Sequence, residues 1–121
     1  MKRAFIALLT VSAVATALGA TIDDFKKDCD NGLGYLCYAV GAAYADGAVG
    51  VRQNWAKASE YYKKGCDLRD AHSCYRLGVS YEKGLGVRQN YRTAKEYYGQ
   101  VCDRGSQAGC DAYARLNKQG Y

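Results

Sequence analysis

The amino-acid sequence predicts an all-α protein, a short α/α solenoid of stacked helix pairs whose joints are cross-linked by disulfides. Three observations predict this fold: a unit of about 36 residues recurs along the chain, cysteines recur in pairs eight residues apart, and proline is absent. Recurrent units of this length are typical of repeat proteins, in which each unit buries its apolar face against its neighbours. The chain of 121 residues is long enough for one domain of ordinary size.

The N-terminal residues are predicted to be a secretory signal peptide covering residues 1–20. A basic segment over residues 1–3 precedes an apolar run over 4–14 and a stretch rich in small residues over 15–20, which is the order found in signal peptides. The apolar run is shorter than the about 20 residues that a membrane-spanning helix needs. Thr21 follows, so no cysteine is available there for lipid attachment. We therefore expect a secreted or periplasmic protein with no stable membrane insertion once the leader is removed.

The cysteines predict three local disulfides. Six cysteines in an exported chain of this size indicate a disulfide framework. Fifteen connectivities are possible and spacing alone does not choose among them, but an eight-residue offset that occurs three times favours three copies of one bridge. The expected pairs are Cys29–Cys37, Cys66–Cys74 and Cys102–Cys110. Zinc is the rival interpretation; the pairs lack the ligand spacing of zinc sites and His72 is the only histidine, so we expect no metal and no cofactor.

Each repeat is predicted to contain two helices. Residues 74–84, CYRLGVSYEKG, correspond to 37–47, CYAVGAAYADG, and 86–98, GVRQNYRTAKEYY, correspond to 50–62, GVRQNWAKASEYY. In the second copy, apolar and small residues recur at i, i+3, i+4 and i+7 from Cys74, which is one face of a helix. Gly84 and Gly86 then supply a tight turn, and Asn90 is placed to cap the second helix.

This alignment divides the chain into four parts beyond the leader. We expect a half repeat over 22–30, complete repeats over about 31–67 and 68–104, and a terminal half repeat over 105–121, which together form one repeat domain over 21–121. Neither helix of a pair can bury its apolar stripe alone, so neighbouring units must stack.

Residues 77–98, LGVSYEKGLGVRQNYRTAKEYY, resemble the Sel1-like repeat, a relative of the tetratricopeptide repeat. The two cysteines in every unit are similar to those of the cysteine-rich proteins of Helicobacter, and the resemblance covers residues 22–121. It implies an exported solenoid that acts as an interaction module for a protein, a peptide or a cell-envelope ligand. Cysteine-rich members of the family also carry the label of penicillin-binding proteins or β-lactamases. The alternative function is therefore that of a penicillin-binding protein or a β-lactamase. The ligand implied is a protein or peptide, cell-wall derived material or a β-lactam.

The candidate functional residues lie mostly on the first helix of the second repeat. Ser80 and Lys83 match the S-x-x-K motif of serine β-lactamases, but neither K-T-G nor S-D-N occurs in the chain. We therefore assign no catalytic residue and keep this pair as the candidate for the alternative function. Arg76, Ser80 and Lys83 form a polar stripe predicted to lie off the core face, and Tyr35 lies outside the repeat pattern. These four residues are the predicted binding surface.

The charge of the chain does not indicate a nucleic-acid partner. The net charge of +5 falls to +3 when Lys2 and Arg3 are removed with the leader, and the remaining charges are scattered along the sequence. A mild positive balance without a basic block favours solubility rather than nucleic-acid binding.

Overall fold

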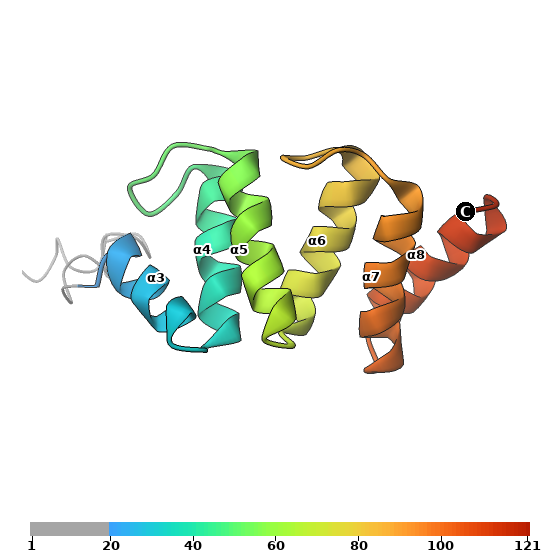
Figure 1. Cartoon of the computed structure of the whole chain (residues 1–121), viewed down its shortest axis with the longest axis horizontal. Helices are drawn as coiled ribbons and strands as arrows, with labels where there is room; N and C mark the ends of the chain where they lie inside the picture. The colour runs from blue at the N-terminus through green and yellow to red at the C-terminus, as the bar shows by residue number, and fades with distance from the viewer. Residues whose placement is uncertain (1–19) are drawn as a thin grey trace, which may run out of the picture.

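The computed structural model describes residues 20–121, so the predicted signal peptide lies outside it apart from Ala20. This part of the chain contains six α-helices and no strand. The helices stand in a row in chain order and run alternately up and down (Figure 1). Their bounds are α3 Ile22–Asp30, α4 Gly34–Asp46, α5 Trp55–Asp67, α6 Ala71–Lys83, α7 Tyr91–Asp103 and α8 Gln107–Lys118. Among these helices, none is long and apolar enough to span a bilayer.

The helix starts follow from local capping. The side chains of Asn54 and Asn90 each accept a hydrogen bond of 3.0 Å from the backbone amide three residues further on, as the sequence predicted for Asn90. Such bonds satisfy a donor that the first helical turn leaves free. At the other end, Gly47 and Gly84 take the left-handed conformation that ends α4 and α6. The paired helices of each repeat are thus delimited by residues of the repeat motif itself.

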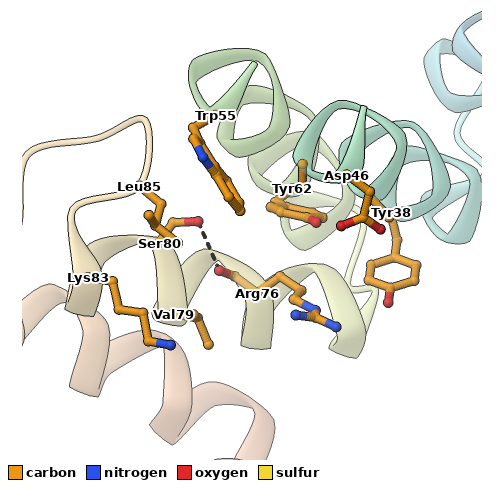
Figure 2. A pocket seen from close by; sticks show the side chains of 11 residues that line it. Tyr38, Asp46, Trp55, Tyr62, Arg76, Val79, Ser80, Lys83 and Leu85 are labelled. Atoms are coloured by element: carbon orange, nitrogen blue, oxygen red, sulfur yellow. Dashed lines mark hydrogen bonds between the residues drawn. The ribbon is translucent and has the colours of Figure 1, made fainter. Parts of the chain in front are cut away.

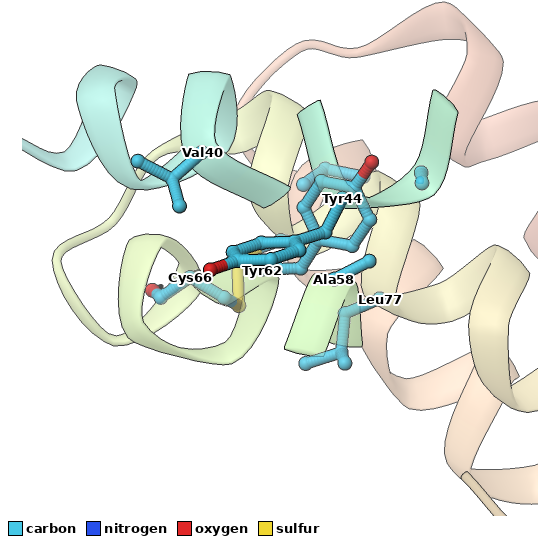
Figure 3. Packing of buried hydrophobic residues seen from close by; sticks show 9 residues of the cluster. Val40, Tyr44, Ala58, Tyr62, Cys66 and Leu77 are labelled. Atoms are coloured by element: carbon cyan, nitrogen blue, oxygen red, sulfur yellow. Dashed lines mark hydrogen bonds between the residues drawn. A yellow bond between two sulfur atoms is a disulfide. The ribbon is translucent and has the colours of Figure 1, made fainter. Parts of the chain in front are cut away.

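Small residues let the helices of one repeat approach closely. A Cβ atom on Gly41 would lie 2.6 Å from the ring of Tyr62, and one on Gly78 would lie 2.8 Å from the ring of Tyr98. Each tyrosine ring therefore packs directly on the backbone of the preceding helix. Figure 3 shows Tyr62 within the main cluster of buried side chains, which continues across the joint to Leu77 of the next repeat. One apolar core thus runs between repeats, as solenoid stacking requires.

The disulfides join consecutive repeats at the corners between helices. The structure links Cys29 to Cys37, Cys66 to Cys74 and Cys102 to Cys110, with Cα–Cα distances of 4.7, 4.5 and 4.5 Å. In each pair the first cysteine lies near the end of one helix and the second lies in the next helix. The predicted all-α solenoid with disulfide-linked joints is confirmed.

The central corner differs from the other two in its backbone. Gly32, Arg69 and Gly105 occupy equivalent places, three residues after the first cysteine, and their φ angles are 100°, 66° and 93°. Glycine adopts positive φ without steric cost, whereas a residue with a Cβ does not. Arg69 therefore introduces local backbone strain at the joint between the two complete repeats.

Polar contacts connect the last three helices. Glu82 of α6 accepts hydrogen bonds from the Tyr98 hydroxyl, at 2.8 Å, and from the Arg115 guanidinium, at 2.7 and 2.9 Å. The guanidinium is the main reason that the pKa of Glu82 is lowered. Burial, reinforced by the bond to Glu82, raises the pKa of Tyr98, so its hydroxyl remains a donor at physiological pH. This cluster fixes α8 against the second repeat.

Candidate functional site

Two adjoining hollows between the repeats form the candidate site, here called the inter-repeat groove. The first, of about 240 Å³, lies between α4 and α6 and is closed by α5 and the loop after α6. The second, of about 430 Å³, lies between α4, α6 and the start of α8. Tyr38 and Arg76 line both hollows. The groove therefore crosses the joints between units, where repeat proteins place their binding surfaces.

Helical spacing brings the groove residues together. On α4, Tyr38, Ala42 and Asp46 recur every four residues, so they share one face. The equivalent places in α6 are Tyr75, Val79 and Lys83, which also line the groove. The two walls thus come from the same positions of two repeats and differ in the residues that occupy them: Asp46 on one wall corresponds to Lys83 on the other.

The charged side chains of the groove are free to meet a ligand. Asp46, Arg76 and Lys83 are exposed, and within residues 20–121 none of their side chains makes a hydrogen bond or an ion pair. Figure 2 shows the Arg76 guanidinium directed toward Tyr38 and Asp46. At the base of the same hollow, burial raises the pKa of Tyr62 to about 12, which keeps its hydroxyl neutral. The site therefore combines exposed, unpaired charges with aromatic rings.

Ser80 does not lie on the exposed stripe that the sequence predicted. Its side chain is only 2% exposed, and its Oγ donates a hydrogen bond of 3.0 Å to the carbonyl oxygen of Arg76, one turn earlier in α6 (Figure 2). A nucleophilic serine must instead transfer its proton to a base. No hydrogen bond joins Ser80 to Lys83 in the described part of the chain. The expectation that Ser80 lies off the core face is wrong: Ser80 is a buried residue of the lining of the first hollow, whereas Arg76 and Lys83 are exposed there.

Tyr35 and His72 occupy the same place in their respective helices. Tyr35 is 62% exposed and does not line either hollow. His72 is the second residue of α6, where it is exposed and its ring centre lies 5.5 Å from that of Tyr38. His72 and its equivalent in α8, Ala108, both line the second hollow. By repeat symmetry, Tyr35 extends the same surface toward the N-terminus.

Sequence reasoning missed most of the groove lining, including Tyr38, Asp46 and Trp55. The signal was present for two of them. Asp46 corresponds to the predicted Lys83, and Trp55 replaces the Tyr91 of the next copy, so both are positions at which the repeats differ. Tyr38 carries no such signal, because Tyr75 stands at the same place in the next repeat. In the described residues, no group of three or more His, Cys, Asp or Glu side chains is arranged to hold a metal ion.

The fold and the groove define a disulfide-linked α/α repeat protein with a surface between its units. A family model described as the Sel1 repeat matches residues 31–70 and 71–106, so the chain belongs to the Sel1 repeat family. Members of this family generally mediate protein–protein interaction. Among curated proteins no significant match was found.

Solved structures agree with this assignment. Cysteine-rich protein B of Helicobacter pylori is 31% identical over 74% of this chain and 67% of its own, with a TM-score of 0.71. A Sel1 repeat protein from Oxalobacter formigenes is 28% identical over 80% of this chain and 70% of its own, with a TM-score of 0.70. A protective antigen of uropathogenic Escherichia coli with an SLR fold has a TM-score of 0.77, but at 22% identity, over 82% of this chain and 21% of its own, it is similar in fold alone.

Proposed function

We propose that the protein is an exported interaction module that binds an extended peptide segment of a partner protein in the inter-repeat groove. The observation that carries the proposal is the set of unpaired charges, Asp46, Arg76 and Lys83, beside exposed or half-buried aromatic rings at the joint between repeats. Two cations against one carboxylate favour a segment that carries at least one acidic group. Aromatic side chains and arginine are also the residues that contribute most to binding at protein interfaces.

The groove suits an elongated ligand better than a compact one. Its two hollows adjoin at Tyr38 and Arg76 and extend from α4 to the start of α8. Within each hollow, small side chains such as Ala42 and Ala71 leave room between the larger rings. A peptide chain crossing the joint would present successive side chains to the two hollows, while Arg76 contacts it from between them.

Peptide selection against the oxidised protein tests this proposal. Peptides enriched from a random library would be measured by fluorescence anisotropy against the unmodified protein, Arg76→Ala and Arg92→Ala. Arg92 is an exposed arginine of α7 that does not line the groove. Truncating one partner of a charged hydrogen bond costs about 1.5–3 kcal/mol, so Arg76→Ala is expected to weaken binding by about tenfold or more while Arg92→Ala leaves it unchanged. Equal affinities of all three proteins for the selected peptides would contradict the groove as the site.

Export to the periplasm or the medium belongs to the same proposal. It is supported by the three disulfides, which persist in oxidising compartments, and by the similarity to a Helicobacter cysteine-rich protein. Fractionation of cells that express the full chain, followed by N-terminal sequencing, tests it. We expect a mature protein that begins at Ala20 or Thr21 outside the cytoplasm; an uncleaved protein in the cytoplasmic fraction would contradict export.

The β-lactamase alternative has no comparable support in the geometry. The Ser80 hydroxyl donates a hydrogen bond to the backbone carbonyl of Arg76 and is almost fully buried. The interaction module is therefore the function that the described residues support best.

A further inference from the structure

The central disulfide, Cys66–Cys74, has an environment that the corresponding N-terminal disulfide lacks. The guanidinium of Arg104 lies beside it, with Nη2 3.3 Å from the Sγ of Cys74. Nη1 of the same group donates a hydrogen bond of 2.6 Å to the carbonyl oxygen of Arg69, which holds the cation in place. The residue equivalent to Arg104 beside the first disulfide is Leu68, which carries no charge. The two bridges therefore differ in the cation beside them: Arg104 contacts a sulfur of the central bridge, whereas Lys64, the cation in the hollow beside the first bridge, is paired with Asp30.

The two sulfurs of the central bridge also differ in access. Cys74 is fully buried, whereas Cys66 is 7% exposed and lines a surface hollow of about 250 Å³. The charged residues of this hollow are Arg69, Asp103 and Arg104. Two guanidinium groups against one carboxylate favour the approach of an anion. A thiolate that enters the hollow therefore reaches Cys66, not Cys74.

We propose that Cys66–Cys74 is a site of thiol–disulfide exchange that reacts with a small-molecule thiol at Cys66. The incoming thiolate sulfur forms a bond to the Sγ of Cys66 while the Cys66–Cys74 bond breaks. The electron pair of that bond leaves on Cys74 as a thiolate next to the Arg104 guanidinium. Cys74 is thereby reduced, the incoming thiol is oxidised into a mixed disulfide on Cys66, and no further oxidant is needed.

The cation beside Cys74 accelerates this step because it stabilises the leaving group. Thiolates next to arginine or lysine have a lowered pKa, and a leaving thiol of lower pKa departs faster. The first disulfide is slightly more buried, with Cys29 at 2% and Cys37 at 0% exposure, and among the described residues no cationic side chain is hydrogen-bonded to its sulfurs. It therefore serves as the reference, and the exchange variants below separate the charge from this difference in access. Exchange at the central bridge would remove the disulfide link between α5 and α6, and α6 forms one wall of the groove. The reaction itself does not depend on the proposed peptide binding.

Time-resolved mapping with glutathione tests the proposal. The oxidised protein is incubated with reduced glutathione, quenched with acid, alkylated with N-ethylmaleimide and analysed as peptides by mass spectrometry. We expect a glutathione adduct on Cys66 with an alkylated Cys74, formed about three to ten times faster than the opening of Cys29–Cys37. An adduct on Cys74, or equal rates at the two bridges, would overturn the proposal. The third bridge is more exposed at both cysteines and reacts on access alone, so its rate does not enter the comparison.

Exchanging the two equivalent residues separates the charge from other differences between the bridges. Arg104→Leu is expected to abolish the rate advantage of the central bridge, with the fold checked by circular dichroism. Leu68→Arg is expected to accelerate opening of Cys29–Cys37 by a similar factor, and it carries the test alone if Arg104→Leu does not fold. A rate ratio that either folded variant leaves unchanged would show that Arg104 does not activate the bridge.

Discussion

Replacing one glycine in each of the two complete repeats measures how much the repeats depend on each other. Gly50 and Gly86 occupy the same place in the repeat, with φ angles of 77° and 75°. A Cβ on Gly86 would lie 2.1 Å from the carbonyl oxygen of Trp55 and 2.6 Å from the amide nitrogen of Ala56, whereas a Cβ on Gly50 meets nothing within 4 Å. Gly86 therefore contacts the first turn of α5, in the preceding repeat.

The loop that carries Gly86 has little freedom to move away. The buried Oγ of Ser59 in α5 donates a hydrogen bond of 2.7 Å to the carbonyl oxygen of Leu85. A Cβ at Gly86 must consequently displace either this bond or the start of α5. Forcing alanine into the left-handed region costs about 1–2 kcal/mol at either glycine. Overpacking adds about 1–3 kcal/mol at Gly86 only.

We therefore expect Gly86→Ala to be less stable than Gly50→Ala by about 1–3 kcal/mol. For a domain of this size, 1 kcal/mol corresponds to about 4–8 °C in Tm. Urea and thermal unfolding of the oxidised proteins, followed by far-UV circular dichroism, give the comparison, and Gly50→Ala is the matched control for backbone strain. Equal losses in the two variants would show that the contact between α5 and the following loop does not couple the repeats.

Three further stability measurements and one activity measurement test other parts of the structure. Each disulfide closes a loop of about nine residues and is expected to add about 2.5 kcal/mol to the free energy of unfolding. Full reduction is therefore expected to unfold the protein at or below ordinary growth temperature. An unchanged Tm after verified reduction would contradict this. The folded pKa of Glu82 is lowered, so its bond to Arg115 stabilises the fold above the ordinary carboxyl pKa and this stabilisation is lost as pH falls. Between about pH 5 and pH 3 the Tm of the unmodified protein should therefore fall more than the Tm of Glu82→Gln. Parallel curves of Tm against pH for the two proteins would refute the linkage. Arg69→Gly is expected to raise stability by about 1 kcal/mol in urea, because glycine occupies the same place at the other two corners; a loss would mean that the Arg69 side chain contributes more than its backbone strain costs. For Ser80→Ala we expect no change in nitrocefin hydrolysis, and turnover that disappears in the folded variant would restore the β-lactamase alternative.

Much of the fold could be predicted because its determinants are local. The periodicity of residues along α6, the asparagine caps at Asn54 and Asn90, and the glycines that end α4 and α6 all act within one or two helical turns. The eight-residue cysteine spacing is also local, since it joins the end of one helix to the first turns of the next. Repetition of these signals indicated that the same unit stacks on itself.

The composition of the functional surfaces depended on tertiary structure. Three features follow from how one repeat packs on the next. Ser80 is buried, Asp46 and Trp55 line the same hollow as Arg76, and Arg104 lies beside Cys74. None of these contacts is encoded in the spacing of its residues, which are separated by up to thirty positions. The sequence by itself determined the helices, their caps and their cross-links through short-range geometry. Only the stacking of repeats decided which side chains line the groove or lie beside a disulfide, because that choice depends on the relative rotation and distance of helices that belong to different units.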